Sequence, residues 1–213
     1  MSTFTILLAG DLTVTPRLRR QIAESTVIAA DGGMAHAKSL EVRPSLWVGD
    51  FDSASKSLQT AYGDVPRETF PIDKDATDGA LAVRFALERG ARRLILCGAL
   101  RGERSDHMLL HMTLALALAK DNCSVLLTAG VEEALPVLPG ACTYDFPNAS
   151  VFSVIGFSDL KGLSLDGARW PLRDHDVALG SSLTLSNHVC GTLKLGLRSG
   201  EAMIAVRLPV NAV

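Results

Sequence analysis

The first 130 residues repeat one alternation of hydrophobic and polar positions, in which a short apolar run is followed by a turn and then by a stretch with helical spacing. The short runs are apolar throughout, which is typical of parallel strands covered on both faces. We expect these strands at Phe4–Ala9, Val27–Ala30, Leu46–Val48, Arg93–Cys97 and Val125–Thr128. Helices are expected at Arg17–Glu24, Met34–Leu40, Ser53–Tyr62, Asp78–Arg89 and Asp106–Lys120. The alternation predicts an α/β domain with a doubly wound parallel sheet and helices on both faces.

The pattern changes after about Gly130. Pro136, Pro139 and Pro147 interrupt a segment that we interpret as a crossover. Short strands with period-2 alternation are expected after it, at Val151–Gly156, Leu160–Leu165, Asp176–Leu179, Thr192–Leu197 and Ala202–Leu208, and no helix is expected beyond Gly156. Short strands with frequent turns predict an antiparallel β-sandwich or partial barrel, and we expect the β-sandwich. We therefore expect two domains, residues 1–130 and residues 131–213.

Composition narrows the class of protein. The chain is 47% hydrophobic and 21% charged, as in an ordinary globular protein, and its net charge of −2 argues against a broad nucleic-acid-binding surface. The most apolar stretch, Leu114–Ala119, is far shorter than the ~18 residues of a membrane span. No basic segment precedes the first apolar run, and the four cysteines form no CxxC pair, so we expect a soluble cytoplasmic protein with reduced thiols.

Acidic residues follow the expected strands at four places. The four segments are Asp31–Gly33, Gly49–Ser53, Asp73–Asp78 and Gly98–His107. Because ligands of an open α/β sheet bind beyond the carboxyl ends of its strands, these segments are expected to meet in one site. Basic residues lie among them, and the combination indicates a metal–nucleotide site. Phosphoryl-type transfer needs little else, because positioning and charge neutralisation supply most of the catalysis.

The pair Asp50 and Asp52 is the strongest indication of a metal. Alternate residues of an extended segment point the same way, so the two carboxylates can face one ligand. Two carboxylates this close repel each other unless a cation lies between them. Mg²⁺ typically takes one or two carboxylates together with phosphate oxygens. The alternative is that Asp52 or Ser53 simply caps the next helix.

The first and third segments also have ordinary structural explanations. Asp31 with Gly32 is either a phosphate-binding turn or only a strand-to-helix turn with an aspartate cap. Asp75 and Asp78 resemble a capping box, with Asp75 at the N-cap. The functional interpretation instead places Lys74 on a phosphate and Asp78 on a metal or a sugar.

The fourth segment, Gly98–His107, joins an apolar strand to the longest expected helix. A glycine-containing loop at a helix N-terminus can cradle phosphates, and Arg104 supplies a planar, bidentate charge. It is not a Walker A loop, because no Gly-Lys-Ser/Thr follows. His107 is more often a hydrogen-bonding residue at a helix start than a catalyst, and we assign it no role.

These segments, in this order, resemble the motifs of the thiamine pyrophosphokinase (thiamine diphosphokinase) family. The matching motifs are Asp-Gly-Gly, Gly-Asp-Phe-Asp-Ser, Asp-x-Asp-x-Thr-Asp and a glycine-containing loop that ends in Arg-x-Asp-His. In the C-terminal half, Arg169-Trp170-Pro171-Leu172 matches an aromatic turn, and Thr184-Leu185-Ser186-Asn187 matches a Ser/Thr-x-Ser-Asn segment. The resemblance therefore covers nearly the whole chain.

The resemblance implies an enzyme that transfers the diphosphoryl group of Mg-ATP to the hydroxyl of thiamine, giving thiamine diphosphate and AMP. It implies a homodimer in which an α/β domain binds Mg²⁺ and ATP and a β-sandwich domain helps to form a thiamine site at the subunit interface. The implied metal ligands are Asp31, Asp50, Asp52 and Asp78, the catalytic residues Asp50, Asp52, Asp78, Arg104 and Asp106, the nucleotide contacts Asp31, Gly32, Lys74, Thr77, Gly98 and Gly102, and the thiamine contacts Trp170, Thr184, Ser186 and Asn187.

Two other functions stay open from the sequence. One is a metal-dependent phosphoesterase, since Asp-x-Asp and Asp-His pairs also build two-metal hydrolytic sites, although these usually recruit several histidines. The other is a non-catalytic nucleotide or vitamin sensor, favoured by Ala80 where many family members carry Glu and disfavoured by the intact aspartates. A local alternative also stays open for Trp170, which either lines the thiamine pocket or fills the core of the sandwich.

Overall fold

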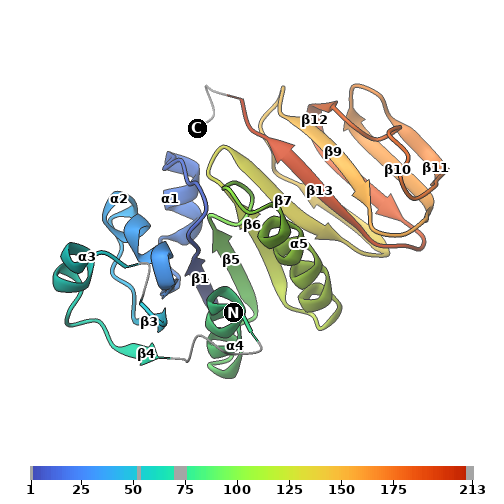
Figure 1. Ribbon diagram of the computed structural model, residues 1–213. Helices are drawn as coiled ribbons and strands as arrows, with labels where there is room; N and C mark the ends of the chain where they lie inside the picture. Colours follow the sequence, from blue (N-terminus) through green and yellow to red (C-terminus); the bar gives the residue numbers. More distant parts are fainter. Residues whose placement is uncertain (1, 52–53, 70–75, 210–213) are drawn as a thin grey trace.

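The parallel part of the fold forms as its sequence pattern predicts. The computed structural model describes residues 2–51, 54–69 and 76–209 (Figure 1). Its parallel strands are β1 (Thr3–Leu7), β2 (Thr26–Ala30), β3 (Leu46–Gly49), β4 (Arg67–Thr69), β5 (Arg93–Cys97) and β6 (Ser124–Thr128), in the order β6-β5-β1-β2-β3-β4. All the expected strands are present with ends shifted by at most two residues, and the short β4 is added at the edge.

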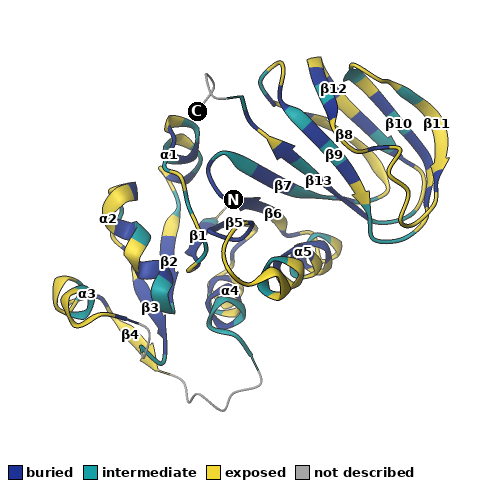
Figure 2. Ribbon diagram, turned by 45° about the horizontal axis from the view of Figure 1, so that its top comes forward, coloured by how far each residue is buried: buried dark blue, intermediate teal, exposed yellow. Residues whose placement is uncertain are grey.

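Helices cover both faces of this parallel sheet. They are α1 (Pro16–Ile22), the 3₁₀ helix η1 (Asp31–Ala35), α2 (His36–Leu40), α3 (Lys56–Ala61), α4 (Asp78–Glu88) and α5 (Ser105–Lys120). Apolar residues of α4 and α5 pack with Phe4, Ile6 and Leu8 on one face, and those of α1 and α2 pack with Leu7 on the other. Because side chains alternate along a strand, a single strand such as β1 contributes residues to both cores. Burial follows the same division, with buried strands between helices whose outer faces are exposed (Figure 2).

The rest of the chain is antiparallel. Its strands are β7 (Glu132–Val137), β8 (Gly140–Tyr144), β9 (Val151–Gly156), β10 (Leu160–Ala168), β11 (Leu172–Val177), β12 (Asn187–Leu197) and β13 (Ala202–Arg207). They continue the sheet from β6 in the order β7-β13-β9-β12-β10-β11, and β8 also pairs with β12. A separate apolar cluster brings together side chains from both ends of this series, among them Val137 of β7 and Val177 of β11. The described part of the chain has no helix beyond Gly156, as expected.

Residues 131–150 do not form the irregular crossover that the prolines suggested, because β7 and β8 lie there. Pro136 is inside β7, opposite Met203, but beyond the β7 residues that pair with β6. A proline is tolerated at such a place because β6 no longer pairs there, so the N–H group that proline lacks is not needed for a hydrogen bond on that side of β7. The strand expected at Asp176–Leu179 is also misplaced, since β11 ends at Val177.

The sheet runs without interruption across residue 130, where we expected the domains to divide. β7 pairs with β6 through Leu127 and Ala134. Arg17 of α1 donates to the Glu133 carboxylate of β7 at 2.7 Å, and Gln21 donates to the same carboxylate at 2.8 Å. Glu133 is buried, and a buried charge that lost its partner would be strongly destabilising. The ion pair therefore ties the parallel part of the fold to the antiparallel part.

Candidate active site

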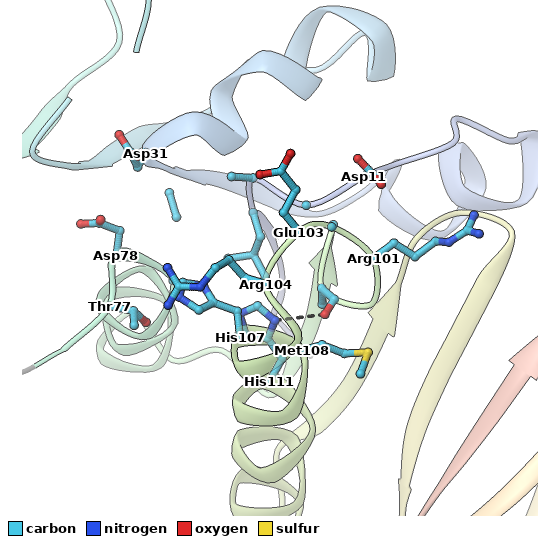
Figure 3. Close-up of a pocket in the computed structure, with 18 of the residues that line it drawn as sticks. Asp11, Asp31, Thr77, Asp78, Arg101, Glu103, Arg104, His107, Met108 and His111 are labelled. Atoms are coloured by element: carbon cyan, nitrogen blue, oxygen red, sulfur yellow. Dashed lines mark hydrogen bonds between the residues drawn. The ribbon is translucent and has the colours of Figure 1, made fainter. Parts of the chain in front are cut away.

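A cavity of about 840 Å³ lies at the carboxyl ends of the parallel strands (Figure 3). Its lining comes from the loops after β1, β2, β3 and β5 and from the first turns of α4 and α5. The polar and glycine residues that line it are Gly10, Asp11, Asp31, Asp50, Thr77, Asp78, Gly79, Gly98, Arg101, Gly102, Glu103, Arg104, His107 and His111. Segments far apart in the sequence thus meet at one site, because parallel strands all end at the same edge.

Three predicted aspartates face this cavity. Asp31 begins η1 with a φ of 42°, Asp50 directly follows β3, and Asp78 is the first residue of α4. Asp31 and Asp78 lie toward one end of the cavity in Figure 3. The N-cap of α4 is Thr77, whose hydroxyl accepts from the Ala80 N–H at 3.2 Å, so a capping box led by Asp75 is wrong.

The loop after β5 closes tightly on the loop after β1. Gly98 has a φ of +78°, and a Cβ on it would lie 2.5 Å from the Leu8 carbonyl oxygen and 2.8 Å from that of Gly10. The Asp11 N–H also donates to the Arg101 carbonyl oxygen at 3.0 Å. Only a glycine permits this approach with this backbone. The requirement for Gly98 is therefore explained by chain packing, whatever ligand the loop holds.

Arg104 and Asp106 form a bidentate pair at the start of α5. The Arg104 guanidinium donates to the two carboxylate oxygens of Asp106 at 2.9 and 2.6 Å. Both side chains are exposed, and Arg104 lines the cavity. The hydrogen bonds from Arg104 hold the pKa of the Asp106 carboxyl well below its ordinary value. Asp106 thus orients the planar group that we expected to contact phosphate.

His111 lies in the wall of the cavity, buried on α5. Its Nδ1 lies 3.1 Å from the Ala99 carbonyl oxygen, which can only accept, so Nδ1 carries the proton of this bond. Burial lowers the pKa of His111 from its ordinary value of 6.5. The neutral ring then presents Nε2 as an acceptor. His107, to which we assigned no role, also lines the cavity.

Some predicted site residues are not placed in the cavity. Asp52 and Lys74 lie outside the described residues. Gly32 is described, but it does not line the cavity.

Three residues that line the cavity were not predicted from the sequence, namely Gly10, Asp11 and His111. A Gly-Asp pair at the end of the first apolar strand was the available signal for Gly10 and Asp11, since Gly49 and Asp50 show the same pattern at the end of β3.

The residues expected to contact thiamine lie in the antiparallel part of the chain. Trp170 is 53% exposed, so the alternative that it fills a core within this chain is wrong. Its ring has the Arg169 guanidinium 5.0 Å from its centroid and the His188 ring at 5.9 Å. Asn187 is buried and fixes the Trp170 backbone, because its Oδ1 accepts from the Trp170 N–H at 3.1 Å and its Nδ2 donates to the Trp170 carbonyl oxygen at 2.7 Å.

The other two expected contacts differ from each other. Thr184 is buried, and its hydroxyl donates to the Val154 carbonyl oxygen at 2.5 Å. Ser186 is exposed and has a φ of 57°. Within the described residues, none of the four expected thiamine contacts lines the cavity that holds the aspartates. Within a single chain, the expected thiamine contacts therefore lie outside the cavity that three of the predicted metal ligands line.

Comparison with known proteins decides the family. The family model "Thiamin pyrophosphokinase, catalytic domain" matches residues 20–127, and the model "Thiamin pyrophosphokinase, vitamin B1 binding domain" matches residues 145–196. The chain belongs to the thiamin pyrophosphokinase family. It is therefore an enzyme of this kind. A curated relative, the thiamine pyrophosphokinase of Bacillus subtilis (strain 168), is 29% identical over 196 residues, which is 89% of this chain and 90% of the relative.

Solved structures of family members share the whole fold. The thiamine pyrophosphokinase of Bacillus subtilis superposes with a TM-score of 0.87 at 24% identity, covering 98% of this chain and all of that one. The enzyme of Geobacillus thermodenitrificans gives 0.81 at 25% identity over the full length of both chains. The yeast enzyme gives 0.78 at 13% identity, covering 100% of this chain and 88% of that one. These three structures therefore have the same overall fold as this chain.

The carboxylates of the cavity fit a magnesium ion that is shared with a nucleotide. In residues 2–51, 54–69 and 76–209, no group of three or more ligating side chains is arranged to hold a metal alone. Mg²⁺ needs no such cage, because it takes one or two carboxylates and completes its shell with water and phosphate oxygens. Asp31, Asp50 and Asp78 supply oxygen donors of that kind at one cavity.

Proposed function

We propose that this family member transfers the diphosphoryl group of Mg-ATP to thiamine, giving thiamine diphosphate and AMP. The observation that carries the proposal is the cavity at the strand ends, where Asp31, Asp50 and Asp78 lie with Arg104. The sequence match to the catalytic-domain model supports it, because that match spans the segments that supply these residues. A site that unites carboxylates with a planar cation suits a charged phosphate chain.

The proposed reaction is a single displacement. The hydroxyl oxygen of thiamine forms a bond to the β-phosphorus of ATP and gives up its proton. The bond from the β-phosphorus to the oxygen that bridges to the α-phosphorus breaks, and AMP leaves with that oxygen. We propose that Arg104, held by Asp106, binds phosphate oxygens, while Thr77, Gly98 and Gly102 shape the nucleotide site. Positioning of this kind supplies most of the rate acceleration in phosphoryl-type transfer.

We propose Asp31, Asp50 and Asp78, together with Asp52, as the residues that hold Mg²⁺. When bound, the ion supplies positive charge that neutralises the phosphate oxygens. The carboxylates have a second effect without it, since they repel a bare triphosphate. ATP is therefore expected to bind much more weakly in the absence of a divalent cation. Gly32 and Lys74 keep their proposed nucleotide contacts, although Gly32 does not line the cavity and Lys74 lies outside the described residues.

We propose that the thiamine site is shared between two subunits of a homodimer. The support is the separation of the two residue groups within one chain, since Trp170 and Ser186 do not line the aspartate cavity. Trp170 offers an exposed aromatic face, which attracts the permanently charged thiazolium ring of thiamine. Asn187 and Thr184 have their described hydrogen bonds within the chain, so we now propose that they act by holding this surface in place.

The finer architecture also belongs to the proposal. Helices on both faces of the parallel strands support a doubly wound domain of residues 1–130. The apolar cluster among the antiparallel strands supports a β-sandwich domain of residues 131–213. We further propose a cytoplasmic location, supported by the state of all four cysteines, each of which is unpaired. No helix in the described part of the chain is long and apolar enough to cross a membrane.

One assay tests the proposed reaction against both alternatives. The full chain is incubated with Mg²⁺ and ATP, with and without thiamine, and AMP and thiamine diphosphate are quantified. The proposal expects the two products in equal amounts, and only when thiamine is present. A phosphoesterase would release AMP or ADP without thiamine, and a sensor would release neither, so either result contradicts the proposal. An Asp50→Asn variant in the same assay attributes the activity to this cavity.

A further inference from the structure

The buried side chain of Trp47 contacts two acidic turns of the cavity at once. Trp47 lies in β3 with none of its surface exposed. Its indole Nε1–H donates to the Asp31 carbonyl oxygen at 2.9 Å, in the turn after β2. Its ring meets that of Phe51 edge-on, with centroids 5.0 Å apart and planes at 88°, in the turn after β3. One side chain therefore joins the turn that carries Asp31 to the turn that carries Asp50.

Both turns have backbones that need external support. Asp31 has a φ of 42° and Phe51 has a φ of 64°, a region that residues with a Cβ seldom adopt. Such conformations persist only where the surrounding structure holds them, and they are frequent at functional sites. Gly49 has a φ of +154°, and a Cβ on it would lie 3.1 Å from the Asp31 Cβ. A residue with a side chain at position 49 would therefore crowd the turn that carries Asp31.

Arg67 braces the same pair of rings from the neighbouring strand. It is the residue of β4 paired in register with Trp47. Its guanidinium lies 4.9 Å from the centroid of the Trp47 ring and 5.2 Å from that of Phe51. It also donates to the Gln59 carbonyl oxygen at 3.0 Å, which fixes its position. A cation placed over aromatic faces in this way is attracted to them.

Packing alone does not explain this arrangement. Trp47 belongs to the apolar core of its face of the sheet, and an apolar core needs filled volume but no hydrogen-bond donor. The indole N–H adds a directed bond to a carbonyl group in a strained turn, 16 residues away along the chain. A buried tryptophan N–H normally finds a partner, and here the partner is the backbone of a cavity aspartate.

We propose that Trp47 is a positioning residue that sets the spacing of the Asp31 and Asp50 carboxylates and so the affinity of the cavity for a divalent cation bound with a nucleotide. Arg67 contacts both rings and holds Trp47 and Phe51 in their relative positions. The inference rests on the proposed function, because it takes the cation and the nucleotide from it. Trp47 contacts neither of them and acts only through the two turns.

The test measures cation binding directly, with Mn²⁺ and a non-hydrolysable ATP analogue in a calorimeter. Trp47→Phe keeps an aromatic ring and removes the N–H donor. We expect it to weaken Mn²⁺ binding by about tenfold, the scale of one lost hydrogen bond, while the KM for thiamine stays unchanged. The matched control is Leu40→Ala, which truncates a buried side chain of the same core at a residue of α2, outside both turns. It should lower the melting temperature and leave Mn²⁺ affinity intact.

Unchanged Mn²⁺ affinity in Trp47→Phe, or an equal loss in Leu40→Ala, would overturn the inference. If Trp47→Phe does not fold, Arg67→Gln answers the same question, since Arg67 is exposed and its loss spares the core. We expect it to weaken Mn²⁺ binding by about two- to fivefold at an unchanged melting temperature, as for one exposed cation–aromatic contact. Wild-type affinity in that variant would count against the inference. A wild-type protein that binds no Mn²⁺ with the analogue would instead refute the proposed function.

Discussion

The Trp170→Ala substitution tests whether Trp170 binds thiamine or only stabilises the fold. Trp170 is 53% exposed, whereas the second tryptophan of the chain, Trp47, is fully buried. A tryptophan buries up to ~250 Å² when it is enclosed, so roughly half of that, about 120 Å², is covered at Trp170. At about 25 cal/mol per Å² the loss is at most about 3 kcal/mol of unfolding free energy, and less for a compact unfolded chain.

The matched control is Trp47→Ala, for which a loss of about 3–5 kcal/mol is expected. At about 2–4 °C per kcal/mol for a chain of this size, the melting temperature should fall less in Trp170→Ala than in the control. The effect of Trp170→Ala on substrate binding should be specific for thiamine. Loss of an aromatic face for the thiazolium cation raises the thiamine KM by about 2- to 30-fold, corresponding to about 0.5–2 kcal/mol, and leaves the ATP KM nearly unchanged.

The assays are steady-state kinetics with each substrate varied in turn and thermal unfolding of both variants. Trp170→Phe serves as the conservative variant, because it retains a flat ring and should recover part of the thiamine affinity. A wild-type thiamine KM in Trp170→Ala, combined with a fall in melting temperature as large as that of Trp47→Ala, would refute the reasoning. Trp170 would then be a packing residue of the assembled enzyme rather than a wall of the thiamine site.

Four further outcomes are expected. Asp50→Asn should lower turnover by at least ~100-fold with no loss of melting temperature, because a like charge is removed from the cavity; near-normal turnover at saturating Mg²⁺ would exclude Asp50 as a ligand. Arg104→Lys should lose much of the rate, since an ammonium group cannot bridge phosphate oxygens in a plane, and equal rates would mean that another residue makes this contact. Burial lowers the pKa of His111, so the unfolded chain takes up the proton at a higher pH than the folded chain, and stability should fall as the pH drops below about 6.5. Urea unfolding of His111→Gln should therefore depend less on pH than that of the wild type, and an identical dependence would disprove the assignment. Mixed dimers of the Trp170→Ala and Asp50→Asn chains should regain activity if the site is shared, and verified heterodimers without activity would confine each site to one subunit.

The fold of the parallel part was predictable because its signals are local. Apolar runs such as Arg93–Cys97 are short and bounded by polar turns, and β5 begins and ends at those residues. The position of the acidic segments was predictable for the same reason, since Asp31 and Asp50 directly follow strands. That they line one cavity follows from the parallel direction of the strands rather than from any contact visible in the sequence.

The antiparallel part was less predictable because its signals depend on neighbours. Pro136 argued against a strand, yet β7 forms because that position lies where the pairing with β6 has ended. β8 was missed because Gly140–Tyr144 is mostly exposed and carries little hydrophobic pattern. The sequence also left open whether Trp170 is buried, since exposure depends on which strands pack against its turn.

By itself, the sequence determined the alternation of strands and helices, the family motifs and the carboxylates at the strand ends, because each depends on residues close together in the chain. Only the tertiary structure decided that Thr77 rather than Asp75 caps α4, that Arg104 is held by Asp106, and that Trp47 joins the turns of Asp31 and Phe51. Those three results depend on the direction in which a side chain leaves its backbone and on what it meets there. The physical reason is that local spacing sets periodicity, whereas the partner of a given side chain depends on the backbone geometry around it, as for Thr77 and Arg104, or on packing between distant segments, as for Trp47.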